Sequence, residues 1–532
     1  MRLDDFPKTF PRLPGAEPVW HGEVGTEDLR ALCEQVAHGG GRLVALWGEE
    51  RRPRSPQGGQ TGLFDAPLTA PATEYVVHVA LVCALGLLVV SHALPHDKPV
   101  YPDLSDLFPA AERMQRACAD LLGLHAQGAA DTRKWLRHGD WPGSVHPLRK
   151  GFDADIRFPH EADDYPFVKV SGQGVHEIPV GPVHAGTIEP GHFRFSVVGE
   201  RVLRLEERLG YKHKGIEKRF EGMTLAQGAR LAGRICGDST VAYAWAYAQA
   251  VEAATRSHVP ARALWLRGLL LELERIANHL GDLGYLGNDV ALAFGFSQFW
   301  ILKEDLLRLH AELFGHRYLM DLIVPGGVSC DLDNTRLIRI AETLTAIEKV
   351  ARRLHHIYEE HAGAQDRFLG TGRVTPELAA QLGLTGLAGR ASSQAWDLRV
   401  QFPCTPYDQL DAHMATHRNG DVAARVIVRF DELFESMRLI RQMLERLPAG
   451  ETFSEPDKAL AGSLGIGWVE GWRGEVLVAL HVDEEGRIGR LHPHDPSWQN
   501  WPVLEHAIMG NIVPDFPLIN KSFNLSYSGV DL

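Results

Sequence analysis

The sequence predicts an α+β domain at the N-terminus, followed by a mainly α domain built on a bundle of long helices. Strand-like apolar runs occupy residues 43–47 and 75–90, and a helical stretch follows near residues 110–124. A loose run rich in Pro, Gly, His and Asp covers residues 152–191 and is typical of a domain boundary. Beyond it, apolar residues recur at every third or fourth position over long stretches, which indicates helices with one buried face.

The composition is that of a globular protein with more than one domain. The chain has 532 residues, of which 45% are hydrophobic and 23% are charged, so it can bury sizeable cores. Its formal net charge of -13 argues against broad contact with nucleic acid, because phosphates require a clustered basic face. Nucleic acid is therefore not an expected partner.

One apolar segment in the first domain has the length of a membrane span. Residues 75–94 form a run of 20 residues without a formal charge. The segment is rich in valine, has Gly86 near its middle and lacks flanking Lys or Arg anchors. We therefore predict two buried strands that meet near Gly86 rather than a transmembrane helix.

The second domain is expected to contain several long amphipathic helices. The clearest stripes of apolar residues lie in 261–283, 335–362 and 422–447. Near the end of the chain, residues 474–482 alternate like a strand and lead into a DEEG turn. We predict domains at 1–152 and 181–532, joined by a linker at 153–180.

The cysteines exclude a local metal-binding motif. They stand at positions 33, 83, 118, 236, 330 and 404, and no two form a CxxC pair, so neither a zinc ribbon nor an iron-sulfur motif is present. Isolated thiols fit a reducing compartment, and the N-terminal residues MRLDDFPKTF do not look like a signal peptide. We therefore expect a cytoplasmic location.

Several blocks along the chain resemble a known family. DTRKWLRHGDWPGSVHPLRKGF, which ends at Phe152, resembles the close of the complex I 30 kDa subunit. The blocks that resemble the complex I 49 kDa subunit and the homologous nickel-iron hydrogenase large subunit are GPVHAGTIEPGHFRF, GYKHKGIEKRFEG, ELERIANHL, GHRYLMDLIVPGGV and NGDVAARVIVRFDELFESM. The fused order is similar to the large subunits of formate hydrogenlyase and hydrogenase-4. The resemblance implies a hydrogenase-large-subunit-like domain with a long-helix bundle and small peripheral sheets.

The nickel ligands of that family are mostly missing here. The resemblance implies four thiolates in two CxxC pairs; Cys236 stands at the first position and Ser239 at the second. Ser526 and Gly529 stand at the positions of the second pair. A serine hydroxyl is a poor ligand for low-valent nickel and glycine has no side chain, so we expect no functional nickel-iron centre.

The family's quinone site is also incomplete. His184 matches a histidine that, by the resemblance, hydrogen-bonds the quinone headgroup, whereas Gly237 takes the place of the family's quinone tyrosine. Tyr243 is either a substitute quinone ligand or, as we favour, a packed helix tyrosine.

Several residues are candidates for proton transfer. Glu217 matches a proton-relay glutamate of the family, and Asp238 is either a helix N-cap or a proton relay. His192, His213 and His279 could carry protons by their chemistry alone. In ELERIANHL we expect one apolar packing face with the charges opposite, and we assign it no chemistry; the apolar residues are Leu273, Ile276, Ala277 and Leu280.

The resemblance implies a peripheral subunit on the cytoplasmic side of the inner membrane, without a transmembrane helix. It would dock a small iron-sulfur protein that carries a [4Fe-4S] cluster and resembles the complex I 20 kDa or hydrogenase small subunit, and it would work with antiporter-like membrane subunits. Electrons would reach a quinone or another small acceptor, as in NADH:quinone oxidoreductases. NAD would bind another subunit, because no GxGxxG follows a strand here, and this chain would hold no cofactor firmly.

Two other functions compete with this one. The chain could be a redox-inactive structural or coupling subunit, or, less favoured, an active hydrogenase. Activity of the isolated chain is not expected. If Cys236, Ser239, Ser526 and Gly529 lay far apart in the structure, the alignment behind these expectations would be wrong.

Overall fold

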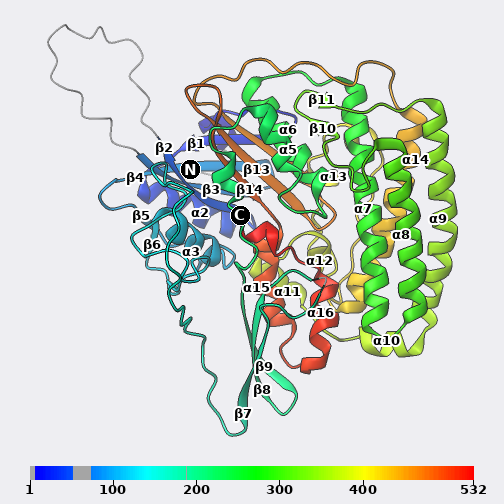
Figure 1. Cartoon of the computed structure of the whole chain (residues 1–532), viewed down its shortest axis with the longest axis horizontal. Coiled ribbons are helices and arrows are strands. Elements are labelled where there is room, and N and C mark those ends of the chain that lie inside the picture. The colour runs from blue at the N-terminus through cyan, green and yellow to red at the C-terminus, as the bar shows by residue number, and fades with distance from the viewer. Residues whose placement is uncertain (1–5, 52–73, 187) are drawn as a thin grey trace. The chain divides into compact units, whose positions relative to one another are not determined.

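A computed structural model describes residues 6–51, 74–186 and 188–532 of the chain (Figure 1). The chain forms two compact units. Unit 1 comprises Met1–Arg12 and Pro18–Pro166, and unit 2 comprises Leu13–Glu17 and Phe167–Leu532. The main division, after Pro166, falls within residues 153–180.

Unit 1 contains a four-stranded mixed sheet in the order β1-β4-β3-β2. β1 pairs parallel with β4, whereas β3 pairs antiparallel with both β4 and β2. The strands are β1 (Val19–Glu23), β2 (Arg42–Arg51), β3 (Glu74–Cys83) and β4 (Gly86–Leu94).

The predicted strand pair at residues 75–94 is confirmed. β3 and β4 form a hairpin in which Cys83 pairs with Gly86. Gly86 has φ +141°, and a Cβ there would lie 2.2 Å from the carbonyl oxygen of Pro18, so only glycine fits this turn. Within the part of the chain that the structure describes, no helix is long and apolar enough to cross a membrane.

Two helices pack on this sheet. α3 contacts β2, and α2 contacts β3 and β4. α3 matches the helix predicted near residues 110–124 and ends at Gly123, which adopts a left-handed conformation. The remaining elements of unit 1, with these helices, are α1 (Phe6–Thr9), α2 (Thr26–His38), α3 (Ala111–Leu122), and the parallel pair β5 (Val100–Pro102) and β6 (His125–Gln127).

Unit 2 is built on the predicted bundle of long helices. α7 (Ala261–Asp289) packs against α8 (Ala293–Phe314) and α14 (Val422–Arg446), and α9 (Asn334–Glu360) packs against α8 and α14. Figure 1 shows these four helices running side by side. The three predicted stripes correspond to α7, α9 and α14, which confirms the helical domain.

α6 (Thr240–Thr255) is buried on all sides and packs against the sheet of β12 (Leu464–Glu470), β13 (Glu475–Val482) and β14 (Ile488–His494). The contact is close, because a Cβ at Gly467 would lie 1.8 Å from the carbonyl oxygen of Ala246. β13 and β14 form the antiparallel pair expected around the DEEG turn.

Shorter elements surround this core. β7 (Val175–Val180), β8 (His192–Val198) and β9 (Arg201–Arg208) form an antiparallel sheet, which Figure 1 shows extending away from the bundle. The other elements are α4 (Ile216–Phe220), α5 (Leu225–Ala232), β10 (Ile323–Val324), β11 (Gly327–Val328), α10 (Ala362–Phe368), α11 (Pro376–Leu382), α12 (Gly386–Arg390), α13 (Leu398–Gln401), η2 (Tyr407–Gln409), α15 (Ser497–Ala507), η3 (Val513–Asp515), α16 (Phe516–Phe523) and η4 (Ser528–Val530).

Candidate functional site

The four positions that correspond to the family's nickel ligands converge at the N-terminus of α6. Cys236 lies in the loop before this helix and is buried. Its thiol donates a hydrogen bond to Asp238 Oδ1 at 2.9 Å, and its Sγ lies 3.0 Å from Ser526 Oγ. The Ser239 hydroxyl donates to the same Asp238 oxygen at 3.1 Å, and the Gly529 amide donates to Ser526 Oγ at 2.9 Å.

A buried arginine that the sequence did not reveal completes this cluster. Arg473 lies in the turn between β12 and β13, and its Nη2 donates to Asp238 Oδ2 at 2.7 Å. Its Nη1 lies 3.3 Å from both Asp238 Oδ1 and Ser239 Oγ, and its Nε donates to the carbonyl oxygen of Asn524 at 2.6 Å. We call Cys236, Asp238, Ser239, Arg473 and Ser526 the Arg473 cluster.

The charges within this cluster stabilise one another. Burial alone would raise the pKa of Asp238, but the Arg473 guanidinium outweighs it and holds this pKa below its usual range. Burial, followed by the nearby Asp238 carboxylate, raises the pKa of the Cys236 thiol. Cys236 therefore stays a protonated hydrogen-bond donor, whereas both nucleophilic attack and metal binding need a thiolate.

Asp495 occupies the space beside the fourth position. A Cβ at Gly529 would lie 2.7 Å from both Cγ and Oδ2 of Asp495, closer than real Cβ contacts come. Two hydrogen bonds fix that carboxylate: Tyr243 Oη donates to Oδ2 at 2.8 Å and the Ser497 amide donates to Oδ1 at 2.9 Å. No side chain at position 529 can point toward the cluster while Asp495 keeps this place.

Asp238 does not cap α6, contrary to one of the two roles expected for it. The amides of Val241 and Ala242, in the first turn, donate instead to Glu274 Oε2 at 2.6 Å and Oε1 at 3.2 Å. Burial raises the pKa of Glu274 to about 8. The carboxyl group of Glu274 on α7 thus accepts hydrogen bonds from the amide groups at the start of α6.

The ELERIANHL block does more than pack one apolar face. We expected its charged residues to lie on the face opposite the packed one. They are instead as buried as its apolar residues. Glu272 is bound by Arg399, Tyr407 and Ser436, and Arg275 donates to the carbonyl oxygens of Glu470 and Gly471 at 2.7 and 2.9 Å. Because Glu470 and Gly471 lead into the turn that carries Arg473, α7 helps to position the arginine.

Glu217 lies in a separate buried group. It sits in α4, and its Oε1 accepts hydrogen bonds from Arg490 Nη2 at 2.9 Å and His492 Nδ1 at 2.8 Å. Burial would raise its pKa, but Arg490 and His492 together lower it. Glu217 is therefore an ionised carboxylate with its Oε1 paired to Arg490 and His492.

His184 lies against a tyrosine that the sequence did not single out. Its ring centroid is 5.4 Å from that of Phe193 and 6.3 Å from that of Tyr527. Its Nε2 is buried without a hydrogen-bond partner among the described residues, and burial lowers the pKa of the ring. Tyr243 instead bonds Asp495 in the interior, which agrees with the interpretation as a packed helix tyrosine.

The three other histidines have separate surroundings. His279 is buried, with its Nε2 3.0 Å from Glu432 Oε2, and His213 Nδ1 lies 3.0 Å from Asp531 Oδ1. His192 Nδ1 lies 3.4 Å from the Gly181 carbonyl oxygen. Among the described residues, His279 reaches the Arg473 cluster only indirectly: its ring centroid lies 6.2 Å from that of Trp472, and the Arg473 guanidinium lies over the same indole ring at 4.3 Å.

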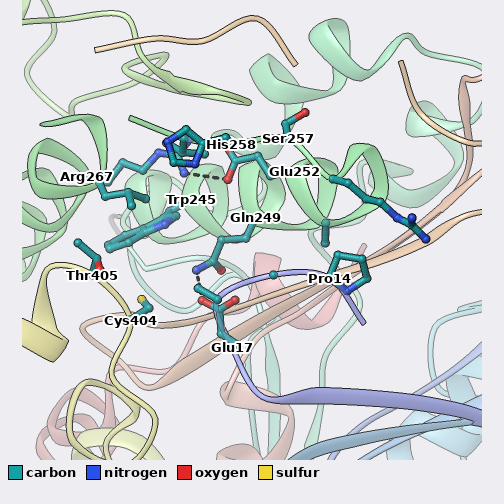
Figure 2. Close-up of a pocket in the computed structure, with 16 residues that line it drawn as sticks. Pro14, Glu17, Trp245, Gln249, Glu252, Ser257, His258, Arg267, Cys404 and Thr405 are labelled. Carbon is teal, nitrogen blue, oxygen red and sulfur yellow. Dashed lines mark hydrogen bonds and ion pairs between the residues drawn. The ribbon is translucent and has the colours of Figure 1, made fainter. Parts of the chain in front are cut away.

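Two cavities lie near α6. One, of about 80 Å³, reaches Asp238 and lies along α7 and α8. The other, of about 410 Å³, lies along the second half of α6 and contains none of the predicted site residues (Figure 2). In Figure 2, Gln249 bonds Glu17 and Arg267 pairs with Glu252, so three of the charged groups of this larger cavity already have partners.

Comparison with known proteins identifies the family. The family model for the respiratory-chain NADH dehydrogenase 49 Kd subunit matches residues 289–463, and that for the 30 Kd subunit matches residues 27–157. Formate hydrogenlyase subunit 5 of Escherichia coli (strain K12) is 31% identical over 466 residues, which cover 86% of this chain and 82% of the relative. The chain belongs to the complex I 49 kDa and hydrogenase large-subunit family, fused to a 30 kDa domain.

The chain is also similar to subunits of other respiratory complexes. An NADH-quinone oxidoreductase subunit from Bacteroides thetaiotaomicron is 29% identical over 452 residues, which cover 80% of this chain and 84% of the relative. A chain in the structure of the membrane-bound sulfane sulfur reductase, an archaeal respiratory membrane complex, aligns with a TM-score of 0.64 and 25% identity. That alignment covers 68% of this chain and 99% of the other. Our chain is thus part of a membrane-associated oxidoreductase complex related to complex I and hydrogenases.

Proposed function

We propose that this chain is the large subunit that receives electrons from a [4Fe-4S] cluster in a small iron-sulfur partner and passes them to a quinone or another small acceptor. His184, whose Nε2 is buried without a partner among the described residues, would donate a hydrogen bond to the acceptor. Glu217 and the Asp238 carboxylate would help to move the protons that accompany reduction. Antiporter-like membrane subunits would complete the complex.

The observation that carries this proposal is the Arg473 cluster. It stands where the family holds nickel, and ion pairs and hydrogen bonds connect it across segments far apart in sequence. An arginine–carboxylate pair in this place offers fixed charge and hydrogen-bond donors rather than metal ligands. That arrangement suits a chain that supports reduction of an acceptor without binding hydrogen itself.

We propose that no nickel-iron centre forms here, because the donors do not fit one. Cys236 is the single thiol among the four positions, and it is held protonated. Ser526 offers a hydroxyl, and Asp495 fills the space beside Gly529. Among the residues that the structure describes, no group of three His, Cys, Asp or Glu side chains is arranged to hold a metal ion.

A redox-inactive structural subunit is the second candidate. The observation in its favour is that the Arg473 cluster is satisfied by its own residues and that the His184 ring packs against Phe193 and Tyr527. Such an interior could serve only to hold the iron-sulfur partner and the membrane subunits together.

Electron transfer in the purified complex separates the two candidates. The complex is reduced with ferredoxin or NADH, and reduction of a short-chain quinone is followed by absorbance. The redox proposal predicts turnover that falls when His184 is replaced by Phe. No turnover, with the partner's cluster present and reducible, would support the structural role instead.

A further inference from the structure

The smaller cavity beside the Arg473 cluster carries several polar side chains on a wall that is otherwise apolar. α7 contributes Glu274 and Asn278, and α8 contributes Lys303 and His310. The other lining residues are Gly237, Asp238, Ala277, Leu307, Arg317, Tyr318 and Leu319. A water molecule needs roughly 10–15 Å³ of such space, so a volume of about 80 Å³ holds several.

Two of the polar groups on this wall have no hydrogen-bond partner among the described residues. His310 is 1% exposed; its Nδ1 lies 3.1 Å from the carbonyl oxygen of Arg317, and its Nε2 is unpaired. The Lys303 ammonium lies over the Trp300 ring at 5.0 Å and forms neither an ion pair nor a hydrogen bond within the described chain. The buried His310 nitrogen and the half-buried Lys303 ammonium are groups that ordered water normally satisfies.

The cavity connects these groups to the Arg473 cluster. Asp238 lines the cavity and also accepts hydrogen bonds from Cys236 and Arg473. Its side chain is 38% exposed in this chain, so water can reach the carboxylate. At the outer side, Tyr318 is 48% exposed and also lines the cavity, which places solvent close to its contents.

Glu274 is the wall residue suited to exchange a proton near neutral pH. Burial is the main cause of its raised pKa, and the Asp238 charge adds to it. The amides of Val241 and Ala242 and the Arg275 guanidinium act in the opposite direction. Across the cavity the charged or titratable groups are Lys303, His310, Arg317 and Tyr318.

We propose that this cavity holds water and is the route by which protons pass between solvent and the Arg473 cluster, with Glu274 and Lys303 as the exchanging groups. The inference rests on the proposed function. Reduction of a quinone to a quinol consumes two electrons, which come from the partner's cluster, and two protons, which come from solvent through this cavity. Glu274 gives up a proton to the cavity water and recovers one from solvent, so that it ends each cycle unchanged.

The first test needs no electron transfer. Infrared spectra of the isolated full chain are recorded between pH 6 and 10. The wild type should lose protonated carboxyl intensity in two steps, because burial raises the pKa of Glu470 to about 7 and that of Glu274 to about 8, and Glu274→Gln should lack the later step. Glu312→Gln, on an exposed part of α8, is the matched control and should keep it. The same carboxyl titration in the wild type and in Glu274→Gln would overturn the proposal.

A second variant covers the case in which Glu274→Gln does not fold. Lys303→Met removes the other exchanging group from the cavity wall, and its effect is measured as the rate of quinone reduction. In the complex, quinone reduction by Glu274→Gln or Lys303→Met should fall at least tenfold with KM unchanged, and the wild-type decrease in rate above pH 8 should disappear in Glu274→Gln. An unchanged rate and pH profile in both variants would overturn the route.

These two measurements separate the failure of the route from the failure of the function. A wild-type complex without any electron transfer would refute the proposed function, and the infrared titration would then decide whether Glu274 exchanges its proton with solvent. Active wild-type complex with a normal rate in both variants would leave the function standing and refute the route.

Discussion

Replacing Gly529 by alanine should destabilise unit 2 through a clash with one carboxylate. The new Cβ would lie 2.7 Å from Cγ and Oδ2 of Asp495. Asp495 cannot move aside freely, because it accepts hydrogen bonds from Tyr243 and the Ser497 amide, and Tyr243 is fully buried. Overpacking costs about 1–3 kcal/mol, and loss of the buried hydrogen bond would add about 1–3 kcal/mol.

Thermal unfolding of the full chain measures this effect. Gly529→Ala should lower the Tm by a few degrees, because the Tm of a unit larger than 250 residues changes by only about 1–1.5 °C per kcal/mol. Gly237→Ala is the matched control, because a Cβ there meets nothing within 4 Å, and its Tm should stay within about one degree of the wild type.

A double-mutant cycle identifies the cause. Asp495→Gly removes the carboxylate together with the Asp495 Cβ, which would also lie only 2.8 Å from the new Cβ, so Gly529→Ala should cost less than about 0.5 kcal/mol in that background. An equal loss in both backgrounds, or no loss in the wild-type background, would refute the reasoning. The same geometry predicts that Gly529→Cys alone does not create a metal ligand.

Three further predictions follow from the same structure. In the native chain, iodoacetamide at pH 8 should leave Cys236 unmodified by peptide mass spectrometry, since burial raises its pKa; rapid labelling would contradict this. Glu217→Gln should destabilise the chain by about 3–5 kcal/mol, because Arg490 and His492 would lose their buried partner. The pKa of Glu217 is lowered in the folded chain, so the stability that its charge provides is lost at low pH. The difference in Tm between the wild type and Glu217→Gln should be largest above pH 5 and should shrink as the pH falls below 4.5. A difference in Tm that does not change with pH would contradict the ionised state of Glu217. His184→Phe should raise the KM for quinone about tenfold with little change in Tm. An unchanged KM would show that His184 does not bind the acceptor.

Sequence patterns predict the elements whose signals are local. Apolar stripes identify α7, α9 and α14, and the uncharged run at residues 75–94 is interpreted as a hairpin because glycine at position 86 interrupts it. The helical domain and the family follow from the order of several motifs. These features depend on residues within one element or on blocks long enough to be recognised.

The chemistry of the site depends on contacts between distant segments, which no local pattern contains. Arg473 stands in an ordinary turn, and only the fold brings it to Asp238. Asp495 and Gly529 are complementary because two separate segments meet there. Glu274 looks in the sequence like part of a charged face, and its contact with the first turn of α6 is visible only in the structure.

Nickel analysis of the complex purified without oxygen tests the central claim most directly. Metal content by mass spectrometry is measured with hydrogen evolution and quinone reduction on the same preparation. The account predicts iron from the partner's cluster, nickel far below one atom per chain, no hydrogen evolution, and reduction of a quinone or another small acceptor. One nickel atom per chain together with hydrogen evolution would contradict it.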